Sequence, residues 1–162
     1  MIKGSHVVVP RLYDHDYAYF FQAPDGRFVF TLPFVDDYTL IGTTERDYDG
    51  DLATPAIDAT EIDYLLAMAN RYFSRDLARK DVVWTFAGLR PLLAKSTDAP
   101  KSVTRDYVLE LDRDGPPLLS VYGGKITTYR KLAQDVVDAL APDSGVRRNH
   151  WTASAPLPGG DM

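Results

Sequence analysis

The sequence predicts an α+β fold in which a mostly antiparallel, mixed sheet carries helices on one face. Short runs rich in aromatic and β-branched residues follow one another in hairpin order, separated by turn residues. A long segment with helical apolar spacing interrupts these runs, and a second one follows the last of them. The 162 residues are 45% hydrophobic and 25% charged, which suits one domain with an ordinary core.

The first half of the chain reads as a meander of strands. Residues 17–21 and 27–32 flank the turn sequence Pro24-Asp25-Gly26, so we expect an antiparallel hairpin there. Residues 38–41 continue the sheet. The aromatic residues of these runs are interpreted as sheet packing, because no basic patch accompanies them as a base-stacking surface would require.

A helix is predicted next, with Thr60 as its N-cap and Asp63 three residues further on. Core burial alone explains its apolar stripe, so no ligand is assigned to it. Glu61 stands at the polar start of the helix and is expected to contribute little to stability. The stripe consists of Ile62, Leu65, Leu66, Ala69, Tyr72 and Phe73.

The second half adds three strands and a helix. The strands are predicted at residues 82–87, 107–111 and 118–122, the last two joined by a turn at residues 112–115. The helix follows Gly124 and is expected to end at Pro142. Its apolar face is Leu132, Val136, Val137 and Leu140. Residues 1–145 are interpreted as one binding domain and residues 146–162, rich in Pro and Gly, as a linker.

Composition excludes several classes of protein. The formal net charge is -5 and Lys and Arg are dispersed, which does not fit a nucleic-acid surface. Without Cys there is no disulfide framework, thiolate nucleophile or zinc finger. His6, His15 and His150 lack metal-ligand spacing, so no metal is expected. No apolar run approaches the roughly 18 residues of a membrane-spanning helix, and any membrane attachment is expected to be peripheral.

The junction at Gly123-Gly124-Lys125 lies between a predicted strand and a predicted helix. Paired glycines allow close approach of a ligand, and a helix start offers free N–H donors and partial positive charge. A tight turn in which the glycines only permit positive φ is the alternative. The junction is not a P-loop, since Leu119 stands where the first glycine is required and no Ser or Thr follows Lys125.

Five segments occur in an order and spacing that resemble one family. They are residues 4–10, 41–44, 85–92, 104–107 and 123–132. Together they closely resemble the FAD-dependent glycerol-3-phosphate dehydrogenases of the D-amino-acid-oxidase-like superfamily, from about Ile2 to Gly160. The resemblance implies a substrate domain whose sheet lies over a flavin. The family's G-x-G-x-x-G fingerprint is missing, so we expect a central part of a larger enzyme, without its Rossmann half. The resemblance also implies that residues 146–162 are a linker toward an absent C-terminal helical domain.

The resemblance also implies roles for three cations. Arg90, in Gly88-Leu89-Arg90-Pro91-Leu92, matches the family's substrate-contacting arginine, and a guanidinium can grip phosphate or a developing alkoxide with two hydrogen bonds. Lys125 is expected to point at the substrate or the flavin edge. Arg105 is a third candidate for substrate binding, although Asp106 could instead pair with it.

His6 is the candidate general base, because imidazole takes up a proton near neutral pH and Gly4-Ser5-His6 matches the family. A histidine that only hydrogen-bonds at a strand start is the alternative. Flavin contacts are expected from Gly123, Gly124, Lys125, Ile126 and Thr127. The remainder of the FAD site would come from the N-terminal half that these residues lack.

The function implied is oxidation of sn-glycerol 3-phosphate to dihydroxyacetone phosphate, with reduction of FAD and transfer of electrons to a membrane quinone. The parent protein is expected to be cytoplasmic, peripheral at the cytoplasmic membrane, with a homodimer possible, and the isolated chain is expected to be inactive. An FAD-dependent oxidase or dehydrogenase of an amino or hydroxy acid is one alternative. A stand-alone binding domain without catalysis is another.

Overall fold

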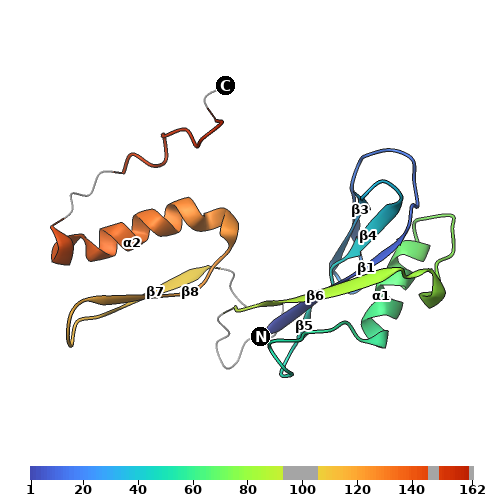
Figure 1. Cartoon of the computed structure of the whole chain (residues 1–162), viewed down its shortest axis with the longest axis horizontal. Helices are drawn as coiled ribbons and strands as arrows, with labels where there is room; N and C mark the ends of the chain where they lie inside the picture. The colour runs from blue at the N-terminus through green and yellow to red at the C-terminus, as the bar shows by residue number, and fades with distance from the viewer. Residues whose placement is uncertain (93–105, 146–149, 161–162) are drawn as a thin grey trace. The chain divides into compact units, whose positions relative to one another are not determined.

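A computed structural model describes residues 1–92, 106–145 and 150–160 (Figure 1). The chain forms two compact units, Met1–Pro91 and Leu92–Met162. Each unit is described by itself. The division of residues 1–145 and 146–162 into a domain and a linker stays a prediction.

The first unit is built on a sheet of six strands. Their order is β2-β3-β4-β1-β5, with β6 paired to β1, and every pairing is antiparallel. The strands are β1 (Ile2–Pro10), β2 (Tyr19–Gln22), β3 (Phe28–Phe34), β4 (Tyr38–Gly42), β5 (Arg46–Asp47) and β6 (Trp84–Arg90). The predicted hairpin is therefore present, with Gly26 at a φ of 79° in its turn.

Strand β1 is the central strand of this unit. It pairs with β4 from His6 to Pro10, with β5 at Ile2 and Lys3, and with β6 from Ile2 to Val8. Because side chains alternate between the two faces of a strand, Ser5, Val7 and Val9 share one face. Their other neighbours along β1, including Gly4 and His6, belong to the opposite face. The central strand thus connects the core with the candidate site.

Helix α1 (Ala59–Asn70) packs against the first of these faces. The core contains valines of β1 together with side chains of β3, β4 and α1. As predicted, Leu65, Leu66 and Ala69 of α1 are buried in it, whereas Tyr72 lies beyond the end of the helix and is 48% exposed. The buried apolar set is Val7, Val9, Ala23, Val29, Ile41, Leu65, Leu66, Met68, Ala69 and Leu77.

The start of α1 differs from the prediction. Its N-cap is Asp58, not Thr60, because Asp58 forms a capping box with Glu61: Glu61 N donates to Asp58 Oδ1 at 2.9 Å, and Asp58 N donates to Glu61 Oε2 at 3.0 Å. Glu61 is only 2% exposed. The expected polar start of the helix is therefore buried at Glu61.

The second unit contains a hairpin and a helix. Strands β7 (Tyr107–Asp112) and β8 (Leu118–Gly123) pair antiparallel, and α2 (Tyr129–Ser144) follows a 3-10 turn at Ile126–Thr128. The Tyr107 hydroxyl donates to Asp135 Oδ2 at 2.5 Å and so joins β7 to α2. Three of the four residues of the predicted apolar face are half-buried, but Val137 is 46% exposed.

Helix α2 continues past the predicted end at Pro142. The proline lies in the last turn, where its missing N–H removes only one helical hydrogen bond. The helix ends instead at Gly145, which is left-handed with a φ of 70° and donates its N–H to Ala141 O at 3.1 Å. No helix within the described ranges is both long and apolar enough to cross a bilayer.

Candidate active site

The imidazole of His6 is held between two neighbouring strands. On β6, Phe86 is its register partner, and the two rings stack with centroids 4.6 Å apart and planes 8° from parallel. On β4, the register partner is Gly42. A Cβ at Gly42 would lie 2.0 Å from His6 Cδ2, so only glycine leaves room for the ring.

Arg90 reaches the same face of the sheet from the end of β6. Its backbone pairs with Ile2, and its guanidinium lies over Gly4, where a Cβ would be 2.5 Å from Nη1 and 2.7 Å from Nη2. Nη2 donates to Thr43 Oγ1 at 3.4 Å. Gly4 and Thr43 therefore form the seat of the guanidinium.

His6 and Arg90 interact electrostatically. Burial lowers the pKa of His6 below its ordinary value of 6.5, and the positive charge of Arg90 lowers this pKa further. A neutral imidazole beside a guanidinium combines a proton acceptor with a cation. This pairing suits removal of a proton from a hydroxyl group whose oxygen gains negative charge.

Two buried nitrogen atoms of this pair have no hydrogen-bond partner within the described structure. They are His6 Nδ1 and Arg90 Nη1. Buried polar atoms are normally satisfied, so two orphaned nitrogens in neighbouring side chains mark this pair as a candidate binding site. An oxygen-bearing anion fits the positively charged Nη1. The alternative for His6 is a histidine that only forms hydrogen bonds at a strand start. Its Nδ1 atom forms none with the described residues.

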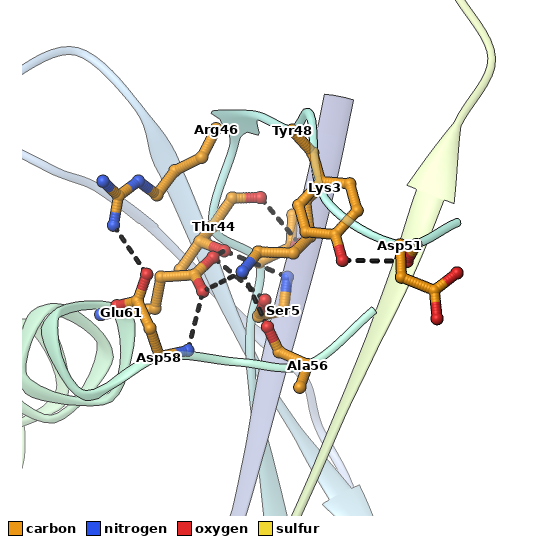
Figure 2. Close-up of polar contacts among 10 residues, drawn as sticks. Lys3, Ser5, Thr44, Arg46, Tyr48, Asp51, Ala56, Asp58 and Glu61 are labelled. Carbon is orange, nitrogen blue, oxygen red and sulfur yellow. Dashed lines mark hydrogen bonds and ion pairs between the residues drawn. The ribbon is translucent and has the colours of Figure 1, made fainter. Parts of the chain in front are cut away.

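A buried polar cluster lies on the core side of β1 (Figure 2). Glu61 Oε1 accepts from Ser5 Oγ at 2.9 Å and from Thr44 Oγ1 at 2.7 Å, while Glu61 Oε2 is 2.8 Å from Lys3 Nζ. Lys3 also donates to Ala56 O at 2.7 Å. We call Lys3, Ser5, Thr44 and Glu61 the Glu61 cluster.

The cluster stabilises Glu61 as a carboxylate. Burial raises the pKa of Glu61, but hydrogen bonds from Lys3, Thr44, the Asp58 N–H and Ser5 outweigh that effect and hold the pKa below its ordinary value of 4.5. The buried charge of Lys3 is compensated in turn. Charged groups this deeply buried require such partners.

The predicted flavin contacts lie in the second unit. Gly123 and Gly124 have φ values of 72° and 88°, as the tight-turn alternative expects. Lys125 is exposed, and its carbonyl accepts from the N–H and the hydroxyl of Thr128. Ile126 is 89% exposed. The prediction that the helix follows Gly124 directly is wrong, because a 3-10 turn at Ile126–Thr128 comes first and α2 begins only at Tyr129.

The structure thus brings together His6 and Arg90 among the predicted residues. Lys125 and the glycines belong to the other unit, and Arg105 lies outside the described residues. Sequence reasoning did not assign roles to Gly4, Gly42 and Thr43, although all three lie in the segments that carry the resemblance. Glu61 lies outside those segments, and nothing in the sequence pattern marked it as part of a site.

A cavity of about 160 Å³ lies elsewhere, beside α1. Arg27 and Arg46 line it, but Arg27 pairs with Asp25 at 2.5 Å and Arg46 with Asp58 at 2.9 Å. Both arginines are therefore already neutralised by carboxylates. The cavity includes none of the predicted site residues, and we assign the candidate site to the His6 and Arg90 pair instead.

The chain is similar to curated dehydrogenases along its whole length. The chain is 48% identical to the glycerol-3-phosphate dehydrogenase of Pseudomonas aeruginosa over 100% of its length and 32% of the relative's. It is 45% identical to the D-erythritol 1-phosphate dehydrogenase of Brucella abortus, again over 100% of the chain and 32% of the relative. The chain therefore spans about a third of the length of these curated relatives.

A solved structure shares the fold. The glycerol-3-phosphate dehydrogenase from Bacillus halodurans, determined in complex with FAD, superposes with a TM-score of 0.72 at 37% identity, covering 98% of this chain and 30% of that one. The family described as FAD dependent oxidoreductase matches residues 1–130. The chain belongs to that family.

Proposed function

We propose that this member of the FAD-dependent oxidoreductase family supplies the substrate-binding part of an enzyme that oxidises sn-glycerol 3-phosphate to dihydroxyacetone phosphate. The observation that carries the proposal is the orphaned pair of buried nitrogens, His6 Nδ1 and Arg90 Nη1. A substrate oxygen would supply the hydrogen-bond partner that each of them lacks. The names of the similar enzymes supply the substrate class.

His6 is assigned the role of general base. Its lowered pKa keeps the imidazole neutral near pH 7, so it can accept the proton of the substrate's secondary hydroxyl. The carbon–hydrogen bond at the same carbon breaks as a hydride, and accepting that hydride is the chemistry that FAD supplies. The loss of one proton and one hydride converts the alcohol to a ketone, so the reaction balances.

Arg90 is assigned to the substrate's phosphate or to its reacting oxygen. A planar guanidinium can donate two parallel hydrogen bonds to either group. Lys125 is proposed to contact the substrate or the flavin edge, and Arg105 to add a further cation. Gly123, Gly124, Ile126 and Thr127 are proposed to contact the flavin, because these residues are exposed or half-buried and the start of a helical turn offers N–H groups.

The proposal extends to the electron acceptor, the location and the assembly of the whole enzyme. Electrons would pass from FAD to a quinone. The protein would be cytoplasmic, attached peripherally at the cytoplasmic membrane, and a homodimer. The isolated chain would be inactive, because much of the FAD site lies in parts of the enzyme beyond these residues. Two alternatives remain. One is an FAD-dependent oxidase or dehydrogenase that acts on an amino or hydroxy acid, and the other is a stand-alone binding domain without catalysis.

A second candidate substrate is D-erythritol 1-phosphate. A relative named for that activity is 45% identical over the whole chain, nearly as similar as the glycerol-3-phosphate dehydrogenase. Both substrates carry a phosphate and a secondary alcohol, so Arg90 and His6 would serve both reactions. Comparing kcat/KM for the two phosphates decides between them.

The test places the 162 residues in a complete enzyme. In a chimaera, they replace the matching third of the Pseudomonas aeruginosa protein, and oxidation of glycerol 3-phosphate is followed with an artificial electron acceptor. Arg90→Lys keeps the charge but loses the two-pronged donor. A charge-assisted hydrogen bond contributes about 1.5–3 kcal/mol, so kcat/KM should fall by roughly one to two orders of magnitude while FAD is retained.

Glycerol without phosphate separates the two roles of Arg90. If Arg90 binds phosphate, the variant should lose little further activity on glycerol; if it contacts the reacting oxygen, both substrates should lose activity in parallel. Wild-type kinetics of Arg90→Lys with both substrates would contradict the assignment. An unmodified chimaera that retains FAD but oxidises neither glycerol 3-phosphate nor D-erythritol 1-phosphate would contradict the proposed function.

A further inference from the structure

We propose that Glu61 positions Arg90 from the opposite face of the sheet, acting through Thr44 and Thr43. The proposal rests on the proposed function, because Arg90 is taken to bind the substrate. Glu61 and Thr44 touch neither His6 nor Arg90 in the contacts described, and they lie on the core side of β1. They are therefore positioning residues, not catalytic ones.

The first step is the fixed place of the Glu61 carboxylate. Its two oxygens receive four donors: the hydroxyls of Ser5 and Thr44, the Lys3 ammonium and the Asp58 N–H. The Glu61 side chain is 1% exposed and that of Lys3 is 8% exposed. Because hydrogen bonds to a buried charge are strong, this carboxylate is a rigid anchor between α1 and β1.

The second step joins the anchor to the segment after β4. The described ladder between β1 and β4 reaches only as far as His6 and Gly42. Beyond it, Ser5 N donates to Thr44 Oγ1 at 3.0 Å, and Thr44 N donates to Ser5 O at 3.2 Å. The Thr44 hydroxyl also donates to Glu61, so a single side chain closes the link (Figure 2).

The third step carries this link to the other face. Thr43 precedes Thr44, and its hydroxyl donates to Thr44 O at 3.0 Å. This bond uses the only hydroxyl proton of Thr43 and leaves its lone pairs free to accept from Arg90 Nη2 at 3.4 Å. The Thr43 oxygen also lies 2.8 Å from the place where a Cβ on Gly4 would be, beside the guanidinium. An anchored Thr44 therefore keeps Thr43 at the seat of Arg90.

The test compares variants of Thr44 and Thr43. Thr44→Val keeps the shape but removes the hydroxyl, whereas Thr44→Ser keeps the hydroxyl and serves as the matched rescue. Thr43→Val removes the hydrogen bonds of the Thr43 hydroxyl with Thr44 O and with Arg90 Nη2, and it leaves all four side chains of the Glu61 cluster in place. The first readout is the pKa of His6, measured by NMR titration in the 162-residue chain under conditions where each variant is folded.

We expect the pKa of His6 to rise toward 6.5 in Thr44→Val and Thr43→Val, because an unseated guanidinium no longer depresses it as strongly. Thr44→Ser should retain the wild-type value. A merely stabilising role would lower the melting temperature without changing the pKa of the folded state. If Thr44→Val fails to fold, Thr43→Val decides; a wild-type pKa in every folded variant would overturn the proposal.

The second readout is kinetic and uses the chimaera described above. Both valine variants should lower kcat/KM for glycerol 3-phosphate by about two- to tenfold, mainly by raising KM, and Thr44→Ser should restore it. Unchanged kcat/KM in both valine variants would also overturn the proposal. If the unmodified chimaera has no activity, the proposed function fails, while the pKa of His6 still decides whether Thr44 and Thr43 position Arg90.

Discussion

The guanidinium of Arg90 occupies the space above Gly4 that a side chain would fill, since a Cβ there would lie 2.5 Å from Nη1. We predict that Gly4→Ala displaces the guanidinium while the fold survives, because the atoms that a Cβ would meet are the far end of the flexible Arg90 side chain and the hydroxyl of Thr43, and none of them belongs to the backbone. In the chimaera, kcat/KM for glycerol 3-phosphate should fall about tenfold or more, the loss expected for one charge-assisted hydrogen bond.

Gly115→Ala is the matched control for this prediction. Gly115 lies in the turn between β7 and β8, and a Cβ there meets nothing within 4 Å. Its kcat/KM should equal that of the unmodified chimaera. A Gly4→Ala variant with unimpaired kinetics would show that the position of Arg90 over Gly4 is not needed for turnover.

Replacement of Glu61 should destabilise the chain as much as a core cavity does. Glu61→Ala leaves the buried Lys3 ammonium without its counter-charge, and breaking a buried ion pair on one side costs about 3–5 kcal/mol. Leu66→Ala removes a buried side chain that is 4% exposed and should cost roughly 2–5 kcal/mol. Urea denaturation of both variants measures the free energies of unfolding.

Asp63→Ala provides the comparison for the loss of a carboxylate from the same helix. Asp63 pairs with Arg79 at the surface, with both side chains more than half exposed, and such ion pairs contribute at most about 1 kcal/mol. If Glu61→Ala cost no more than Asp63→Ala, the Glu61 cluster would not stabilise the fold as its burial indicates.

The titration of His6 should make the first unit less stable in mild acid. Its folded pKa lies below the unfolded value of 6.5, so the unfolded chain binds more protons between these two values. The free energy of unfolding should therefore decrease as pH falls from 6.5 to the folded pKa. We expect this decrease to be smaller in Arg90→Met, which removes one cause of the shift, and absent for this group in His6→Gln.

Urea denaturation at several pH values between 7.5 and 5 measures this effect, taken as the difference between wild type and His6→Gln. The difference cancels the contribution of the carboxylates, including Glu61, whose stabilising ionisation is lost only as pH falls below about 4.5. A difference that does not change with pH would mean that the pKa of His6 is the same in the folded and unfolded chain.

Much of the sheet could be predicted because its strands alternate and its turns carry Pro, Asp and Gly at the required places. The proximity of His6 and Arg90 could be expected only through the resemblance, since 84 positions separate them and the pairing of β1 with β6 brings them together. Nothing in the local pattern orders strands across such a distance.

The Glu61 cluster could not be predicted for a related reason. A glutamate in the first helical turn is normally solvated, and capping chemistry explains it completely. Its burial follows from Lys3 and Ser5 of β1 and from Thr44 in the segment after β4, all at least 17 positions away in the sequence. Likewise, both Thr60 and Asp58 are residue types found at N-caps, and the capping box with Glu61 forms only from Asp58.

The last prediction concerns the flavin. Adenine and pyrophosphate are bound by a Rossmann unit with its glycine fingerprint, which these 162 residues do not contain. The segment from Gly123 to Thr127 offers at most a few backbone contacts to the flavin. We therefore expect the isolated chain to purify without yellow colour, and the chimaera, with the remaining parts of the Pseudomonas aeruginosa protein, to retain FAD through gel filtration. Stoichiometric flavin absorbance in the isolated chain would contradict a site assembled from two parts, because no more than one part would then be needed to hold the cofactor.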